Sequence, residues 1–474
     1  MDEDVWSNIY SLLTIIKRLQ MMMSMPVVPL HKKCRRQKIF AGQKKNLNFA
    51  FDILLMSNQT ITTHTDLSAF KSRFHIPFNS KGEYRYFCGN SLGLQVKSTR
   101  NFVLQELDDW AHHGVLGHEH AKYPWVHYHE FLTDRMADVV GALSSEVVVM
   151  NTLTVNLHLM MVSFYRPTKK RYKIIMEASA FPSDRYAVES QIRFHGLDPA
   201  DALLILKPSP GETIISDQEI AHFIKVNGEE TALILIGSVN YYSGQAYPLG
   251  DIVRWGQAQG SMVGFDLAHG AGNLRLRLHD DGPDFAVWCS YKYLNSGPGS
   301  LASCFVHSRH HRQFDIPRFA GWWGHDKATR FKMSDQLQLM PGAEGWQLSN
   351  PPILPMACMM ASLEVFAEAG MDQLRKRSLE LSTYFLHQIN GIAHPDIQII
   401  TPQENERRGC QISLRIKNAD KSLYNEISAK NIIADWREPD VIRVAPVPLY
   451  NDESDIDTFC DVLRESILYE GKSS

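Results

Sequence analysis

Two chemically active side chains, Asp266 and Lys292, follow short apolar stretches that we expect to be strands. Asp266 closes the stretch Met262–Asp266, and Lys292 comes three residues after the stretch Phe285–Cys289. Ligands of an open α/β sheet bind at the carboxyl ends of the strands, so both side chains can face one site. A carboxylate that keeps a pyridine nitrogen protonated and a lysine that forms a Schiff base suit pyridoxal phosphate. These two residues alone leave a second alternative equally open, a buried Asp–Lys ion pair.

Other local patterns are less specific. The segment Gly297–Ala302 matches a loose dinucleotide-loop pattern, but it lacks the strand, helix and later acid of such a loop, so we expect a turn. The region 112–129 is rich in histidine, without the H-E-x-x-H or C-x-x-C spacing of zinc sites, and we expect no metal. These histidines are His112, His113, His118, His120, His127 and His129. The seven scattered cysteines indicate reduced thiols and not a disulfide framework.

Strands and helices alternate along the chain around these residues. We expect strands at 172–177, 202–206, 232–236, 262–266, 285–289 and 303–306. Ser216 and Glu219 form a capping box ahead of a helix, and a second helix is expected around 250–259. Alternation of this kind predicts an α/β fold with a mainly parallel sheet and helices on both of its faces.

The pattern changes after Asn350-Pro351-Pro352. A helix over 355–369 ends at Gly370, and further strands are expected at 397–400, 411–416, 432–435 and 441–444. We therefore divide the chain into a large domain, 61–350, and a smaller C-terminal α/β domain, 351–474. The first part of the large domain is expected to pack with the small one.

The composition limits the class of protein. With 474 residues, 44% of them hydrophobic, the chain has enough apolar content for two or three folded domains and is neither disordered nor fibrous. A net charge of −3 gives no reason to expect nucleic acid or an anionic membrane as partner. No apolar run reaches the roughly 18 residues of a membrane-spanning helix.

Residues 1–60 form a basic N-terminal extension. Nine basic and four acidic residues lie within 1–55, so this stretch carries +5 and the remainder −8. A targeting or membrane-surface arm is one interpretation. The simpler one is an unstructured extension, with Met56 as the natural start, and we leave it out of the fold.

Nine segments in order make the chain similar to the kynureninase family of fold-type I pyridoxal-phosphate enzymes, from about residue 66 onward. They are Cys88–Gln95, Leu153–His158, Phe181–Asp184, Tyr242–Gln245, Gly264–His269, Ser290–Asn295, Gly321–His325, Ser349–Pro352 and Arg443–Tyr450. The resemblance implies the fold-type I transferase fold, with a mainly parallel seven-stranded sheet in the large domain and the small α/β domain at the C-terminus.

The resemblance also implies roles for individual residues. Lys292 would carry pyridoxal phosphate and move the substrate's Cα proton, Asp266 would pair with the pyridine nitrogen, and Phe181 would stack on the ring. Tyr242 would be a second catalytic residue, whose hydroxyl faces the developing oxyanion. The remaining cofactor contacts would be Leu153, Thr154, Asp184, Tyr242, His269, Tyr291, Trp322 and Asn350. Substrate contacts would be Ser91, His118, Ser349, Asn350 and Arg443, the last for the α-carboxylate.

The implied reaction is hydrolysis of L-kynurenine or 3-hydroxy-L-kynurenine to L-alanine and anthranilate or 3-hydroxyanthranilate, a step of tryptophan catabolism that can feed NAD biosynthesis. The resemblance further implies a cytoplasmic homodimer in which Ser91, Trp322 and Asn350 reach the neighbouring subunit's cofactor. One departure concerns Gly237-Ser238, where many kynureninases have the order Ser-Gly. A serine contact cannot be assigned to Gly237, and Ser238 should point to the opposite side of the strand.

Two alternatives remain at this point. A cysteine desulfurase-like lyase of the same fold would need a reactive cysteine on a mobile loop, and none of the seven has an obvious loop context. A catalytically silent binding protein is disfavoured because Lys292 and Asp266 are both present.

Overall fold

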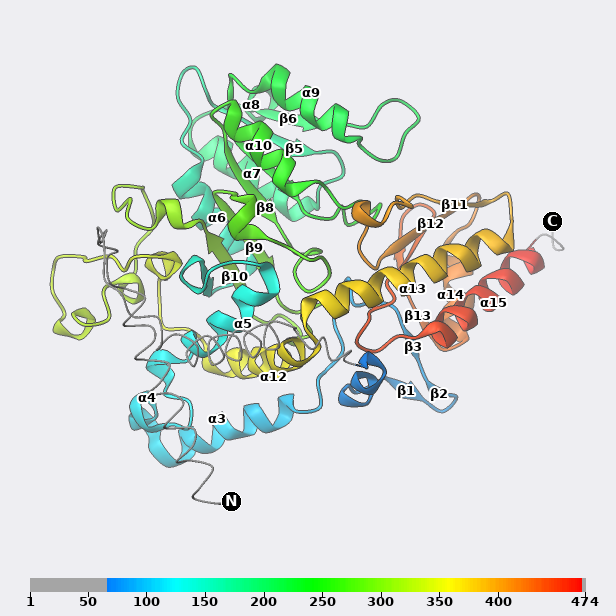
Figure 1. Ribbon diagram of the computed structural model, residues 1–474, viewed down its shortest axis with the longest axis horizontal. Coiled ribbons are helices and arrows are strands. Elements are labelled where there is room, and N and C mark those ends of the chain that lie inside the picture. The colour runs from blue at the N-terminus through cyan, green and yellow to red at the C-terminus, as the bar shows by residue number, and fades with distance from the viewer. Residues whose placement is uncertain (1–65, 471–474) are drawn as a thin grey trace, which may run out of the picture. The chain divides into compact units, whose positions relative to one another are not determined.

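The computed structural model describes residues 66–470 and the side chains through residue 467. The predicted extension at residues 1–60 lies outside the described residues. Two larger sheets, one of seven strands and one of four, organise the described chain, with helices packed around them (Figure 1).

The larger sheet contains the predicted strands of the region 172–306. In spatial order its strands are β4 (Val147–Val149), β10 (Ala302–Val306), β9 (Phe285–Cys289), β8 (Met262–Asp266), β7 (Thr231–Gly237), β5 (Lys173–Glu177) and β6 (Leu203–Leu206). Strand β10 runs antiparallel to β4 and β9, whereas the other pairs are parallel. The prediction of a mainly parallel sheet is confirmed. Strand β4 was not predicted because its three residues are too short for a recognisable pattern.

Helices cover both faces of this sheet, as the alternating pattern predicted. The described α-helices are α3 (Thr99–His113), α4 (Gly117–His120), α5 (Glu130–Val140), α6 (Leu153–Phe164), α7 (Pro182–Phe194), α8 (Pro199–Ala202), α9 (Asp217–Asn227), α10 (Leu249–Ala258), α11 (Leu278–Asp281), α12 (Ile353–Ala369), α13 (Met371–Ile392), α14 (Lys421–Ala429) and α15 (Glu453–Glu470). Ser216 caps α9, and its capping box with Glu219 is present as predicted.

Successive strand residues face two different cores. Leu233 and Leu235 of β7 belong to the same buried apolar cluster as residues of α6 and α7, whereas Ile234 and Ile236 belong to the cluster that includes residues of α5, α9, α10 and α12. This alternation is the period of two that an extended strand imposes on its side chains. Both faces of the sheet are buried beneath helices. Polar side chains can therefore reach a ligand only at the ends of the strands, where loops follow.

The smaller sheet is antiparallel throughout. Its order is β11 (Ile397–Ile399), β12 (Ile412–Ile416), β15 (Val441–Val444) and β14 (Asp435–Arg437). The single strand expected at 432–435 is wrong, because the chain changes partner there. Strand β13 (Ile432–Ile433) pairs with β3 (Arg85–Tyr86), and β14 begins only at Asp435.

Residues near the start of the described chain therefore lie with the C-terminal part. Beside the β3–β13 pair, the 3-10 helix η1 (Leu67–Arg73) places Lys71 2.8 Å from Asp452, and a hairpin of β1 (Phe78–Asn79) and β2 (Gly82–Glu83) follows. The domain boundary at 350/351 stays a prediction. Helix α12, which follows it, packs on α3 and α5.

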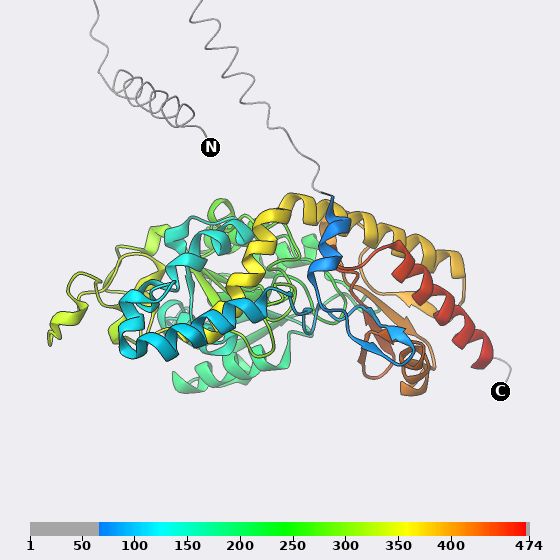
Figure 2. The same cartoon turned by 90° about the horizontal axis from the view of Figure 1, so that it is seen from below.

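Helices α12 and α13 are separated by Gly370 and bend by 80° relative to each other. The change of direction between the two helices is visible in Figure 2. Helix α13 packs against α15. Within residues 66–470 no single helix combines the length and apolar composition needed to cross a membrane, and the bent pair meets that test only by length and composition.

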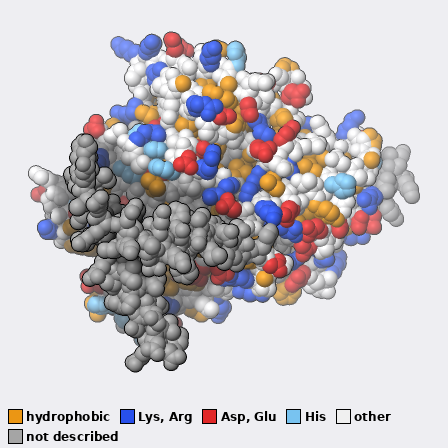
Figure 3. Space-filling model, viewed as in Figure 1, with side chains coloured by type: hydrophobic (Ala, Val, Ile, Leu, Met, Phe, Trp, Pro, Cys, Tyr) orange, Lys and Arg blue, Asp and Glu red, His pale blue; other side chains and the backbone are white. Residues whose placement is uncertain are grey.

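Charged side chains of both signs are interspersed on the face shown in Figure 3. The whole sequence holds 49 basic and 52 acidic residues. Charges that act on a ligand are therefore expected to be local groups, such as those of the cavity described next.

Candidate active site

A cavity of about 180 Å³ lies at the carboxyl ends of the central strands. Strands β5, β7 and β8 contribute one residue each at their last position, and the loop after β9 contributes Lys292. Helices α6 and α7 point their first turns into the same cavity. The lining residues are Leu153, Thr154, Glu177, Phe181, Ser183, Asp184, Gly237, Val239, Tyr241, Asp266, Ala268, His269, Tyr291 and Lys292.

Lys292 and Phe181 face each other across this cavity. The Lys292 Nζ lies 5.7 Å from the centre of the Phe181 ring and 6.0 Å from that of Tyr291. Phe181 precedes Pro182, the first residue of α7, and its side chain is 46% exposed although it lines a cavity. An aromatic ring with an uncovered face is suited to stacking on a flat ligand.

Three buried carboxyl groups line the cavity. Asp266 Oδ1 accepts a hydrogen bond from the Ala268 amide at 2.6 Å. Burial, and next the negative charge of Asp266, raise the pKa of Asp184 well above its ordinary value. Burial raises the pKa of Glu177 to about 7. Crowded carboxyl groups of this kind favour a cationic partner, because a positive charge beside them offsets both burial and mutual repulsion.

Unpaired oxygen atoms within this group test whether such a partner fits. Asp184 Oδ1 and Glu177 Oε2 are buried and have no hydrogen-bond partner among the described residues. Buried polar atoms in folded proteins nearly always have a partner, so these atoms are suited to a ligand that brings a donor. The protonated pyridine nitrogen of pyridoxal phosphate is such a donor.

His269 supplies a neutral imidazole at the same end of the cavity. Burial lowers the pKa of His269 well below its ordinary value, and the positive charge of Lys292 adds to the effect. Its Nδ1 is buried without a partner among residues 66–470. A neutral ring keeps one donor and one acceptor nitrogen available to a polar ligand.

Another part of the cavity lining is suited to a phosphate. Leu153 and Thr154 are the first two residues of α6, and Ser183 lies in the first turn of α7. The first amides of a helix have no partner within the helix, and they favour an anion together with the helix dipole. The hydroxyls of Thr154 and Ser183 are hydrogen-bonded to each other at 3.2 Å, so one of the two O–H groups stays available to donate to a ligand. The polar groups of the lining therefore fit both the ring nitrogen and the phosphate of pyridoxal phosphate.

The comparisons with known proteins agree with this geometry. A family profile for the kynureninase C-terminal domain matches residues 374–463. The kynureninase of Myxococcus xanthus is 53% identical over 399 residues, which cover 84% of this chain and 94% of the relative. That of Koribacter versatilis is 54% identical over 385 residues, 81% of this chain and 91% of the relative. The chain belongs to the kynureninase family. The family prediction is confirmed.

Solved structures confirm the predicted fold. The cysteine desulfurase of Thermococcus onnurineus matches with a TM-score of 0.67 and 16% identity, over 82% of this chain and 95% of that one. A C-DES variant with glycine covalently linked to its pyridoxal-phosphate cofactor matches with a TM-score of 0.70 and 14% identity, over 81% and 96%. The desulfurase alternative thus shares the fold at low identity, whereas the kynureninases share about half of their residues with this chain.

The structure brings eight predicted site residues of this family member into one cavity. They are Leu153, Thr154, Phe181, Asp184, Asp266, His269, Tyr291 and Lys292. Tyr242 does not line it. Its neighbour Tyr241 does, with ring centres of the two tyrosines 6.4 Å apart. Arg443 lies next to the cavity, where its Nη1 donates to the Tyr241 carbonyl at 2.6 Å.

A second cavity, of about 300 Å³, holds three more of the residues predicted from the kynureninase resemblance. His118, Trp322 and Asn350 line it together with Trp323 and Phe331. It shares no lining residue with the cofactor cavity. Two other predicted residues, Ser91 and Ser349, are exposed and line neither.

Sequence reasoning missed several lining residues, among them Glu177, Ser183 and Tyr241. Glu177 could only be found from the strand order, which places β5 beside β7. There the Gly237 amide donates to Glu177 Oε1 at 3.1 Å, and a Cβ at position 237 would lie 3.0 Å from the same oxygen. Gly237 therefore makes room for the carboxyl group. Ser238 packs instead toward Gly270, as the strand alternation predicted.

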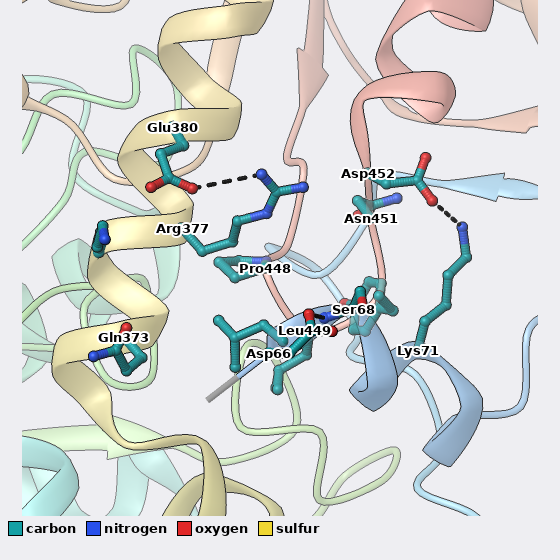
Figure 4. Close-up of a pocket in the computed structure, with 13 residues that line it drawn as sticks. Asp66, Ser68, Lys71, Gln373, Arg377, Glu380, Pro448, Leu449, Asn451 and Asp452 are labelled. Carbon is teal, nitrogen blue, oxygen red and sulfur yellow. Dashed lines mark hydrogen bonds and ion pairs between the residues drawn. The ribbon is translucent and has the colours of Figure 1, made fainter. Parts of the chain in front are cut away.

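A larger cavity, of about 460 Å³, lies between η1, α13 and the loop 448–452 (Figure 4). Two of its basic side chains are paired: Lys71 lies 2.8 Å from Asp452, and Arg377 lies 3.5 Å from Glu380 and 2.7 Å from Glu453. None of the predicted site residues lines it. Its size alone therefore gives no reason to place the chemistry there.

Two groups of histidine and carboxylate side chains have the spacing of metal ligands. In one, His129 and Glu344 lie 2.9 Å apart, but the Lys327 ammonium lies 3.0 Å from Glu344 and 2.8 Å from Glu130. In the other, Glu146 accepts hydrogen bonds from the amides of Leu143 and Ser308 and pairs with His279. The atoms that would bind a metal in each group already have partners within the protein, whereas the other ring nitrogen of His129, Nδ1, is buried without a hydrogen-bond partner among the described residues.

Proposed function

We propose that the protein is a kynureninase that hydrolyses L-kynurenine, 3-hydroxy-L-kynurenine or both to L-alanine and the matching anthranilate. The observation that carries the proposal is that Lys292 and Asp266 share one cavity in a chain about half identical to curated kynureninases. Pyridoxal phosphate, when bound, supplies the electron sink for breaking the bond between Cβ and Cγ.

The residues of the cavity have distinct tasks in this proposal. Asp266, with Asp184 behind it, holds the proton on the cofactor's ring nitrogen. Phe181 stacks on the cofactor ring and fixes its plane. His269 offers a hydrogen bond to the polar substituents of that ring. Lys292 holds the cofactor before substrate arrives, and afterwards its amine takes the Cα proton and returns it.

Water must next add to the substrate ketone, and negative charge then develops on that oxygen. A hydroxyl donor placed there lowers the barrier, because it binds the oxyanion more strongly than the ketone. Tyr242 stays our first candidate for this donor. Tyr241 is the second, since it lines the cavity itself.

We also propose a homodimer with shared active sites, in the cytoplasm. His118, Trp322 and Asn350 line a cavity separate from that of Lys292 within one chain. In a symmetric dimer such a surface can complete the neighbour's site. Trp322 would then cover the aryl group, Ser91 and Ser349 would lie at the boundary, and His118 and Asn350 could bond a ring hydroxyl. The polar pair favours acceptance of 3-hydroxykynurenine.

The test is a product assay with both candidate substrates. Purified protein loaded with pyridoxal phosphate is expected to release L-alanine and the matching anthranilate in equal amounts. Comparing kcat/KM for the two substrates settles the preference. Inactivity of the loaded protein on both would remove the assignment and leave the fold standing.

A further inference from the structure

One carboxylate, that of Asp435, is shared by two arginines beside the cofactor cavity. Arg443 Nε donates to Asp435 Oδ1 at 3.2 Å, and Arg443 Nη2 lies 2.7 Å from Oδ2. Arg437 Nη2 donates to the same Oδ2 at 3.1 Å, with its Nε 2.9 Å from Oδ1. Both guanidinium groups therefore surround a single anionic group.

The register of the small sheet builds this arrangement. Asp435 of β14 lies directly opposite Arg443 of β15, so their side chains are cross-strand neighbours. Arg437 follows two positions later on β14 and shares the face of Asp435, because strand side chains alternate. The pattern Asp-x-Arg on one strand and Arg on the next therefore places the side chains of Asp435, Arg437 and Arg443 on one face of the sheet.

Charge in this group does not balance. Among residues 66–470, Asp435 is the one carboxylate within ion-pair distance of either guanidinium, which leaves one positive charge over. The side chain of Arg443 is only 1% exposed, and that of Arg437 is 37% exposed. Asp435 and Arg443 are largely buried and screened little by water, so an anion that joins the group would offset the remaining positive charge of the group.

The excess charge lies next to the proposed reaction site. The two guanidinium carbons lie 5.8 and 5.9 Å from the centre of the Tyr241 ring, for Arg443 and Arg437 respectively. Tyr241 lines the cofactor cavity, and its ring centre is 5.5 Å from that of Phe181. After burial and Lys292, the charges of both arginines also help to lower the pKa of His269.

We propose that Arg437 is a second residue that binds the substrate's α-carboxylate, beside Arg443, and that Asp435 is the positioning residue that holds both guanidinium groups. This inference rests on the proposed function. An amino-acid carboxylate brings the single negative charge that the group lacks. Arg437, half exposed, meets the carboxylate from the solvent side, and the buried Arg443 receives it from below.

The experiment compares Arg437→Gln with wild type as holoenzymes. Two quantities are measured on each preparation: the KM for L-kynurenine, and the inhibition constant of L-kynurenine amide, in which an uncharged carboxamide replaces the carboxylate. We expect the substitution to raise KM about 10-fold, which is the loss of one charge-assisted contact. The amide's inhibition constant, kcat and the affinity for pyridoxal phosphate should stay within about twofold. Both constants are measured on the same preparation, so a fraction of misfolded protein does not change their ratio.

Two further variants complete the test. Arg437→Lys keeps the charge but loses the two-point contact with Asp435, so it should recover only part of the affinity for L-kynurenine. Arg415→Gln is the matched control, since Arg415 is 32% exposed in the same sheet and pairs with Asp440 at 3.6 Å. An unchanged KM in Arg437→Gln, or equal weakening of acid and amide, would overturn the inference. If wild type itself fails to hydrolyse kynurenine, the proposed function fails first.

Discussion

The Lys292 Nζ lies 5.7 Å from the centre of the Phe181 ring, although the two residues come from different elements. Phe181 caps the start of α7, and Lys292 follows β9. A flat ring stacked on Phe181 therefore lies within reach of the Lys292 amine. Asp266, at the end of the neighbouring strand β8, lines the same cavity and can bind the ring nitrogen.

Replacing Lys292 by alanine should remove both the visible absorption of the bound cofactor and the activity. The physical reason is that no other lysine lines the cavity within residues 66–470, so neither imine formation nor Cα proton transfer has a substitute. We expect kcat to fall by at least about 10³-fold. Lys225→Ala, an exposed position on α9, should leave spectrum and rate unchanged.

Asp266→Asn should leave a protein that binds pyridoxal phosphate but uses it poorly. The amide no longer stabilises a proton on the ring nitrogen, so the ring accepts electrons less well. We expect kcat to fall about 100-fold or more, with a pH-sensitive cofactor spectrum. Asp335→Asn, at an exposed position, is the control. A normal rate in Asp266→Asn would show that Asp184 or Glu177 holds that proton instead.

Glu177 should make the cofactor-free protein less stable as the pH rises. Burial raises the pKa of Glu177 to about 7. Between the ordinary pKa of a glutamate and pH 7, the folded protein therefore keeps a proton that the unfolded chain has released. The contribution to stability is complete below the ordinary pKa and is lost as the pH rises toward 7, by about 3 kcal/mol in all.

Glu177→Gln should reduce that dependence, and Asp184, whose pKa is also raised, should contribute what remains of it. Its amide oxygen still accepts the Gly237 hydrogen bond, but no titrating group remains at the position. Urea unfolding at several pH values between about 5 and 7 measures the slope. The exposed Glu212→Gln is the control and should follow wild type. Equal slopes in all three proteins would contradict the raised pKa.

Shared active sites predict complementation between two inactive variants. Lys292→Ala removes the cofactor lysine, and Asn350→Ala alters the separate cavity that we assign to the neighbour's site. Subunits of both kinds, unfolded and refolded together in equal amounts, should recover about a quarter of wild-type activity, because half of the dimers then carry one intact site. Refolding of each variant alone is the control. No recovery in a proven dimer would argue for independent sites.

Much of the large sheet and the main catalytic pair could be predicted from the sequence. The strand ends were placed within one residue for β5 to β10, because each strand is a buried apolar run between turn signals. Asp266 and Lys292 stood out for the same reason, as polar groups at the ends of such runs.

What could not be predicted depends on which strands are neighbours. Glu177 ends a predicted strand, yet its place beside Gly237 follows only from β5 lying next to β7. Asp435 was assigned to the end of one strand, whereas it begins another, opposite Arg443. Periodicity along the chain carries no information on pairing between strands, so these contacts appear only in the folded structure.

The central claim is that the cavity around Lys292 holds the cofactor and performs the reaction. The most direct measurement is reduction of the cofactor-loaded protein with borohydride, followed by mass spectrometry of its peptides. We predict one phosphopyridoxyl group per chain, attached to Lys292, with activity lost in proportion to labelling. Labelling at another lysine, or full activity in Lys292→Ala, would contradict the account.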